Sequence, residues 1–316
     1  MSRRHFRIKI MQALYAFFQG GDTRLDVAER QLKKSFDKMY ELYIYQVSFI
    51  VEMLVFARYR MEEARKKFFP TEDDLNPNTR FVDNVVVAAI ADNARFQRLV
   101  ENYKINWSEE TEMIRRIWMD FRESEAMKQY LAQEESGLKA DREILKVLIR
   151  DFMAPSEMLR FFFEEKNIHW ADDFETMLSL VLKTLKEFKP GSDAFPPELI
   201  RTGNVEDDIK EFVQPLFRKT IAKSEDYGKM IAAQAKNWEF DRIAVMDVIL
   251  MKMAICELIH FPSVPIKVTI NEYIEISKQY STPKSRVFIN GMLDKLVETL
   301  KVQKLIAKSG RGLLEN

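Results

Sequence analysis

Helix-breaking residues are scarce in this chain, and their scarcity limits the fold more than any other feature. The 316 residues include only 9 glycines and 10 prolines, and the long stretches between them are rich in Leu, Ile, Met, Ala, Glu, Lys and Arg. This composition favours helices over sheet. The sequence therefore predicts an all-α fold with almost no strand.

Two proline-containing stretches predict connections between blocks of helices. Residues 69–78 and 189–197 combine prolines with Asn, Asp or Gly, which form turns. They divide the chain into three helical blocks. The most apolar stretch, Leu42–Ala57, contains Gln46 and Glu52 and is shorter than the roughly 20 apolar residues that a membrane span needs. We interpret it as a buried helix.

Three tryptophans are followed by similar short segments. Trp107, Trp170 and Trp238 each precede an acidic or Ser residue of the kind that caps a helix start, and then an apolar-periodic segment. An internal duplication or the reuse of one helix-start signal explains the pattern equally well. In both cases we expect the three rings to anchor the core rather than to contact a ligand.

The cysteine and histidine content indicates a cytoplasmic protein without a cofactor. The lone Cys256 has no second thiol for an internal disulfide, and no Cys/His cluster has the spacing that zinc requires. His5, His169 and His260 are far apart, and no Gly-rich loop could hold a nucleotide. We therefore expect no metal, no cofactor and no catalysis. The apolar run near the amino terminus is interrupted and lacks a cleavage site, which argues against a signal peptide.

Positive charge gathers at the amino terminus although the formal net charge is zero. Arg3, Arg4, Arg7 and Lys9 all precede the first acidic residue, Asp22. Such an arm is either a solubilising terminus or the footprint of a nucleic-acid site.

The amino-terminal segment has the spacing of an amphipathic helix. One face is expected to pack against a core and holds Phe6, Ile10, Ala13, Leu14 and Phe17. A flanking face brings together Arg3, Arg7, Met11 and Tyr15. Guanidinium groups beside a phenol ring suit phosphate contact and base stacking in single-stranded RNA. The alternative is a partly buried Tyr15 beside solvated arginines.

Residues 238–304 predict three helices. The apolar positions of the first cover a wide face, which indicates a central helix, and the second spans 266–280. The third is expected to begin with Thr282 as N-cap and Pro283 at the first helical position.

Phe288 lies near the start of that third helix, about 100° round from the core position Ile289. A partly exposed Phe there could stack on a base. Filling a gap between helices is the alternative.

Two parts of the sequence resemble the NusB family of transcription antitermination factors. Residues 3–7 and the string Gln12-Ala13-Leu14-Tyr15 are similar to its Arg-rich opening. The longer match lies within 264–295 and contains Val264-Pro265, Ile270-Asn271-Glu272 and Phe288-Ile289-Asn290-Gly291-Met292-Leu293-Asp294-Lys295 in order.

The resemblance implies NusB-like helical bundles enlarged by an additional multi-helix block. Residues 1–20 and 205–305 would form the RNA-binding core, and 21–204 would be an inserted or expanded helical region, related to the tryptophan repeat if that is genuine. Residues 306–316 would be a flexible tail. The resemblance further implies a non-enzymatic protein that binds boxA-type elements of ribosomal RNA leaders with the ribosomal protein NusE, in the transcription elongation complex.

Carried onto matching positions, the resemblance implies that the RNA is bound by Arg3, Arg4, Arg7, Tyr15 and Phe288. It implies that NusE is bound by Asp247, Lys252 and Glu257. The chain departs from the family pattern at His5, Phe6, Ile8 and Lys284, so selectivity for one boxA sequence does not follow.

Two other functions are weighed against RNA binding. The first alternative is an enzyme, because related helical domains can precede an RNA methyltransferase domain. Turnover in a methyl-transfer assay would support it. A helical interaction scaffold or ribosome-assembly factor without antitermination activity is the second alternative, and it predicts unchanged RNA affinity when the amino-terminal arginines are replaced by Glu.

Overall fold

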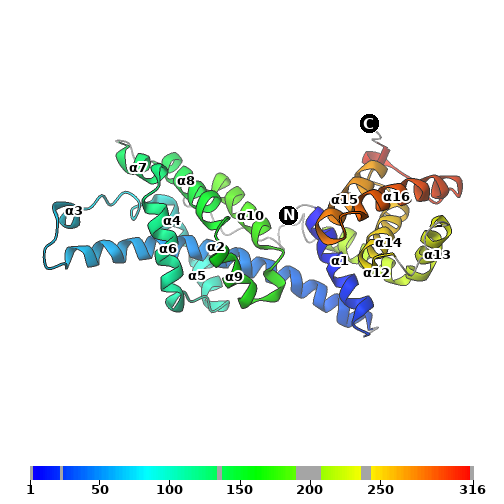
Figure 1. Cartoon of the computed structure of the whole chain (residues 1–316), viewed down its shortest axis with the longest axis horizontal. Coiled ribbons are helices and arrows are strands. Elements are labelled where there is room, and N and C mark those ends of the chain that lie inside the picture. Colours follow the sequence, from blue (N-terminus) through cyan, green and yellow to red (C-terminus); the bar gives the residue numbers. More distant parts are fainter. Residues whose placement is uncertain (1–2, 22–23, 134–136, 190–207, 236–242, 314–316) are drawn as a thin grey trace. The chain divides into compact units, whose positions relative to one another are not determined.

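The computed structural model describes residues 3–21, 24–133, 137–189, 208–235 and 243–313 (Figure 1). Every regular element within these ranges is helical, which confirms the predicted all-α class. The chain divides into two compact units. We call residues 1–35 with 201–316 the terminal unit, and residues 36–200 the central unit.

The central unit is built on the carboxyl-terminal part of α2 (Leu25–Arg65), since the unit boundary falls within that helix. The other α-helices of this unit are α3 (Glu72–Leu75), α4 (Val85–Ala91), α5 (Ala94–Asn102), α6 (Thr111–Arg122), α7 (Glu125–Ala132), α8 (Leu138–Val147), α9 (Glu157–Lys166) and α10 (Phe174–Glu187). A π-helical turn, Leu148–Met153, continues α8, and 3-10 helices lie at Ser108–Glu110 and Ile168–Trp170.

Trp107 and Trp170 both pack on α2, which confirms their prediction as core anchors. Their ring centroids lie 5.9 and 5.2 Å from that of Tyr45. The Trp107 indole N–H donates to the Ser48 hydroxyl at 3.0 Å, and that of Trp170 donates to a backbone carbonyl of α2 at 2.8 Å. The third ring of the pattern, Trp238, lies outside the described residues.

One helix in the described part of the chain, α2, is long and apolar enough to cross a membrane by length and composition. Within its most apolar window, however, 72% of the residues are buried inside the protein. Most of Leu42–Ala57 is buried, as predicted, so packing in the core accounts for the apolar composition.

The terminal unit begins with α1 (Arg3–Gln19) and the first part of α2. It continues with a π-helical turn, Ile209–Val213, and with α12 (Gln214–Ala222), α13 (Ser224–Gln234), α14 (Val245–His260), α15 (Ile266–Tyr280) and α16 (Ser285–Val302). α14 is buried along most of its length, and α1, α12, α13, α15 and α16 all pack against it. The predicted central helix is thereby confirmed.

The start of α16 differs from the sequence prediction. The helix begins at Ser285, and residues 282–284 form a turn in which the Ser285 N–H donates to the Thr282 carbonyl. Thr282 therefore does not cap the helix. The physical reason is that the Ser285 hydroxyl, bonded to Thr282 and to the buried Asp247, organises this turn.

After α16 the chain turns back along the terminal unit. The sequence predicts a flexible tail from residue 306, and the structure describes that segment as far as Leu313, with a 3-10 helix at Gly310–Leu313. Its Ser309 N–H donates to the Pro262 carbonyl at 3.0 Å, and Lys308 Nζ donates to the Phe261 carbonyl at 3.1 Å. We call residues 303–313 the carboxyl-terminal segment.

Candidate nucleic-acid interface

A buried ion pair fixes the position of α1. Phe6, Ile10 and Leu14 pack into the core as predicted. Arg7 is buried with them, at 2% exposure, and its Nε and Nη2 donate to the two carboxylate oxygens of Glu257 at 2.8 and 2.6 Å. This bidentate contact joins α1 to the central helix α14.

Two hydroxyl groups of α15 complete the surroundings of Glu257, which is itself 0% exposed. Thr269 Oγ1 and Tyr273 Oη donate to its carboxylate at 2.9 and 3.0 Å. Burial alone would lower the pKa of Arg7, but the Glu257 carboxylate outweighs it and raises that pKa overall. Arg7 is therefore charged throughout the accessible pH range, and it holds three helices together.

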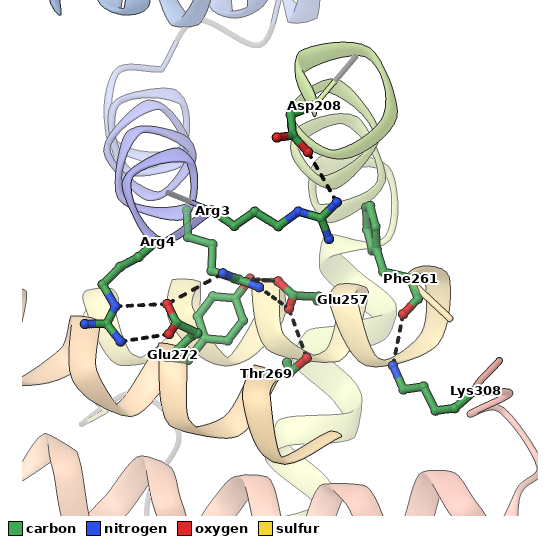
Figure 2. A network of polar contacts seen from close by, with 10 residues as sticks. Arg3, Arg4, Asp208, Glu257, Phe261, Thr269, Glu272 and Lys308 are labelled. Atoms are coloured by element: carbon green, nitrogen blue, oxygen red, sulfur yellow. Dashed lines mark hydrogen bonds and ion pairs between the residues drawn. The ribbon is translucent and has the colours of Figure 1, made fainter. Parts of the chain in front are cut away.

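Arg3 and Arg4 lie at the surface on either side of this pair (Figure 2). Arg4 makes a bidentate contact with Glu272 of α15, at 2.9 and 2.7 Å. Arg3 reaches Asp208 at 3.2 Å and lies over the Phe212 ring, 5.1 Å from its centroid. Both ion pairs are partly open to water, where such contacts are weak and can be exchanged for another anion.

These arginines line an open cleft of about 680 Å³ in the terminal unit. Its cationic side chains are Arg3, Arg4, Arg7 and Arg311. The connection before α15 and that helix's first turn supply Ser263, Val264, Pro265 and Val268, while His5 and Glu272 complete the lining. A cleft with several guanidinium groups and an apolar wall suits a phosphate-bearing strand.

His5 does not add to this charge at neutral pH. Burial, and the positive charge of neighbouring Arg4, lower its pKa below the ordinary value of 6.5. The imidazole is therefore mainly neutral at pH 7 and can donate or accept one hydrogen bond at each ring nitrogen.

The two aromatic residues predicted to stack on bases are both accessible. Tyr15 is 44% exposed and lies two turns after Arg7 on α1, and Phe288 is half-buried in the first turns of α16. The charges of Arg4 and Arg286 both lower the pKa of Glu275, after the larger effect of its hydrogen bond with Lys278. α1 and α16 both pack against α15.

Three of the residues predicted to make contacts are buried: Arg7, Asp247 and Glu257. Arg7 is 2% exposed and its charge is neutralised by Glu257, so it lines the cleft without an exposed guanidinium group for RNA. Glu257 is consequently unavailable to a protein partner. Asp247 is buried too, and it accepts hydrogen bonds from Ser281 and Ser285 at 2.5 and 2.7 Å, so it organises the turn between α15 and α16.

Lys252, the third residue predicted to face a partner, is half-buried. Its Nζ donates to Ser224 Oγ at 2.7 Å and lies 5.2 Å from the centroid of the Phe18 ring. Burial lowers the pKa of this lysine. Of the three predicted partner residues, it is the one with side-chain atoms near the surface.

Sequence reasoning missed two residues of the cleft, Glu272 and Arg311, and also Asp208, the ion-pair partner of Arg3. Glu272 was quoted within a motif but given no role, and Asp208 and Arg311 were not considered. The sequence does contain a signal for Glu272, because four basic residues at the amino terminus need carboxylate partners when their helix packs against a core. The positions of Asp208 and Arg311 depend on tertiary packing that no local pattern encodes.

Among the described residues, no group of His, Cys, Asp or Glu side chains has the arrangement of a metal site. The cleft has the chemistry of an anion-binding surface, since guanidinium groups donate in fixed directions to oxygen acceptors.

Comparison with known proteins points to one family. The NusB family model matches residues 178–298. A "Transcription antitermination protein NusB" from Salinibacter ruber is 43% identical over 117 residues, which cover 37% of this chain and 73% of the relative. No solved structure shows a significant match.

Two further relatives carry the same printed name. The protein from Chloroherpeton thalassium is 43% identical over 106 residues, which are 34% of this chain and half of that relative. The protein from Koribacter versatilis is 34% identical over 101 residues, which are 32% of this chain and 69% of the relative. All three matches cover a little over a third of the chain or less.

Proposed function

Because this chain belongs to the NusB family, we propose that it is an RNA-binding transcription antitermination factor that acts without catalysis. The RNA would be a boxA-type element of a ribosomal RNA leader, bound together with NusE. The bound complex would tether nascent RNA to the elongation complex and oppose termination.

The observation that carries this proposal is the arginine-lined cleft of the terminal unit. Arg3 and Arg4 reach it with exposed side chains, and each is held by a carboxylate that a phosphate can replace. Arg7 supports the site from beneath, since its buried pair with Glu257 fixes the helix that presents the other two. Phosphate contacts of this kind supply affinity that falls steeply with salt.

Tyr15 and Phe288 would supply the contacts to bases. Both rings have accessible faces, and stacking on an aromatic side chain is tolerant of base identity. Phe288 lies in α16, which packs against α15 as α1 does. An unpaired strand held by the arginines could therefore reach one ring or both.

Asp247 and Glu257 are buried, which reduces the number of residues available for the proposed contact with NusE. Lys252 remains, at the surface formed by α13 and α14 next to Phe18. A charge at the rim of an interface contributes mainly to association rate and specificity.

The test is the binding of labelled leader RNA by an Arg3→Gln/Arg4→Gln variant, at two salt concentrations, with and without NusE. The salt slope of log affinity should become smaller by about 0.7 for each lost phosphate contact. Arg218→Gln is the matched control, because Arg218 forms an exposed ion pair with Glu29 in the same unit but does not line the cleft.

Wild-type affinity and slope in the double variant would favour the interaction scaffold instead. A transcription assay with a terminator downstream of the leader provides a second readout. Read-through should depend on the protein and should fall in the double variant but not in the Arg218 control.

A further inference from the structure

The four arginines of the cleft differ in how their charges are compensated. Arg3, Arg4 and Arg7 are each paired with a carboxylate: Asp208, Glu272 and Glu257 respectively. Within the described part of the chain, Arg311 has no such partner, and its side chain is exposed. Among the described residues, the cation of this cleft without a carboxylate partner therefore comes from the carboxyl-terminal segment and not from the amino-terminal arm.

We propose that Arg311 is a phosphate-binding residue of this site, and that the carboxyl-terminal segment is anchored so as to present it to the RNA backbone. The proposal rests on the proposed RNA-binding function and adds a residue that lies outside the part of the chain matched by the family model. The ligand group is a phosphodiester of a single-stranded RNA.

Three contacts anchor the segment next to the cleft. Lys308 Nζ and the Ser309 N–H donate to the consecutive carbonyls of Phe261 and Pro262. Figure 2 shows Lys308 reaching Phe261 from the segment. Gly312, directly after Arg311, is buried against the same connection.

Gly312 fits only because it lacks a side chain. A Cβ placed there would lie 1.9 Å from the Pro262 carbonyl oxygen and 3.0 Å from its carbon. These are backbone atoms, which cannot move aside as a flexible side chain can, so any other residue at 312 must displace the segment. Displacing the segment would carry Arg311 away from the cleft.

The first turn of α15 strengthens the anion site. Pro265, at the N-cap of this 15-residue helix, makes no side-chain capping bond, and the first turn contains no acidic residue. Val264, Pro265 and Val268 line the cleft. The helix dipole at this end favours an anion, and it adds to the attraction of Arg311.

The experiment compares Arg311→Gln and Gly312→Ala with the wild-type chain. Binding of labelled leader RNA and of a scrambled RNA of equal length is measured over a range of salt concentrations. A phosphate contact carries no sequence information, so Arg311→Gln should weaken both RNAs by the same factor, about 3- to 10-fold, and should reduce the salt slope by about 0.7. Gly312→Ala should reproduce that loss although it removes no charge.

Two controls separate a local effect from a general one. Gly137→Ala is the control for a glycine replacement, because nothing lies within 4 Å of a Cβ at that position. Arg218→Gln is the control for loss of an exposed arginine. Both should bind RNA like the wild type, and circular dichroism should show that all four variants are folded.

Each result has one meaning. Wild-type affinity and slope in Arg311→Gln would overturn the proposal even while the wild type binds RNA and the proposed function stands. If Arg311→Gln lost RNA affinity while Gly312→Ala kept it, Arg311 would remain a phosphate-binding residue, but the proposed role of Gly312 in anchoring the segment would be wrong. Failure of the wild type to bind the leader would overturn the proposed function, and this inference with it.

Discussion

Arg7 and Glu257 lie 250 residues apart in sequence and form a bidentate ion pair in the interior of the terminal unit. The side chains are 2% and 0% exposed. Charges of this kind cost free energy to bury, and their attraction offsets that cost only when both partners are present.

We therefore expect Glu257→Gln to lower the free energy of unfolding by about 3–5 kcal/mol, because it leaves the Arg7 charge buried beside a neutral group. The double change Arg7→Met/Glu257→Leu should recover much of this loss, since it removes both charges. Urea unfolding followed by circular dichroism measures the effect. A double variant less stable than Glu257→Gln would contradict the explanation.

Asp247→Asn should destabilise the turn between α15 and α16. The carboxylate accepts one hydrogen bond from each of two Ser hydroxyls, and an amide offers one acceptor oxygen and adds a donor that needs a partner. The expected loss is about 1–3 kcal/mol. Asp294→Asn, on the exposed face of α16, is the control and should leave the melting temperature unchanged.

Tyr15→Ala should weaken RNA binding and Tyr15→Phe should not, because a phenyl ring stacks on a base as well as a phenol ring does. Loss of one stacking contact costs about 1–3 kcal/mol, roughly 5- to 150-fold in affinity. Fluorescence anisotropy with the leader RNA measures it. Tyr59→Ala, an exposed tyrosine of the central unit, should bind like the wild type. If Tyr15→Ala kept full affinity, Tyr15 would have no part in recognition.

Stability should fall on acidification from pH 7.5 to 5.5. Burial lowers the pKa of both His5 and His260 in the folded chain. The positive charge of Arg4 lowers the pKa of His5 further, and the charges of Lys219 and Lys223 lower that of His260. The unfolded chain, with His pKa values of about 6.5, then binds protons first as pH falls. The two neutral histidines therefore contribute their full stability above about pH 6.5, the pKa in the unfolded chain. This contribution is lost as the pH falls towards the lower pKa of each histidine in the folded chain.

Denaturation midpoints measured across this pH range test the effect. His5→Asn and His260→Asn should each flatten part of the pH dependence and leave the slope above pH 7.5 unchanged. A wild-type chain that grew more stable on acidification through pH 6 would contradict the sign.

Trp170→Ala should destabilise the central unit by about 3–5 kcal/mol, because it removes a large buried ring and its hydrogen bond to the Lys38 carbonyl. RNA affinity should persist, since the cleft residues all belong to the terminal unit. Thermal melting and anisotropy on the same sample measure both. If Trp170→Ala also lost RNA binding at a temperature below its melting transition, the placement of the RNA site in the terminal unit alone would be contradicted.

The helices of the terminal unit could be predicted because their apolar residues recur at helical spacing. Phe6, Ile10 and Leu14 show the required face of α1, and the wide apolar surface of α14 shows that neighbours surround it. Helix ends were less predictable. Thr282 and Pro283 have the composition of a helix start, yet a tertiary contact to Asp247 decides where α16 begins.

The site was predicted in part. Clustering of arginines near the amino terminus located the cleft, but a helical wheel cannot distinguish an arginine that faces solvent from one that faces a buried carboxylate. Glu257 was predicted only as a NusE contact, because the charge pattern of α14, which also holds Asp247 and Lys252, does not show that this carboxylate is buried with Arg7. Arg311 lies in a segment without periodicity, and its placement follows from the packing of Gly312.

The hydrogen bonds that converge on Glu257 also bear on the order in which the chain can fold during its synthesis. α1 is synthesised before its docking partners Glu257 and Tyr273, and Arg7 and Glu257 are 250 residues apart. At about 5–20 residues per second, that delay is on the order of tens of seconds. During this delay the apolar face of α1 lacks its final neighbours, so it is open to chaperones and to aggregation.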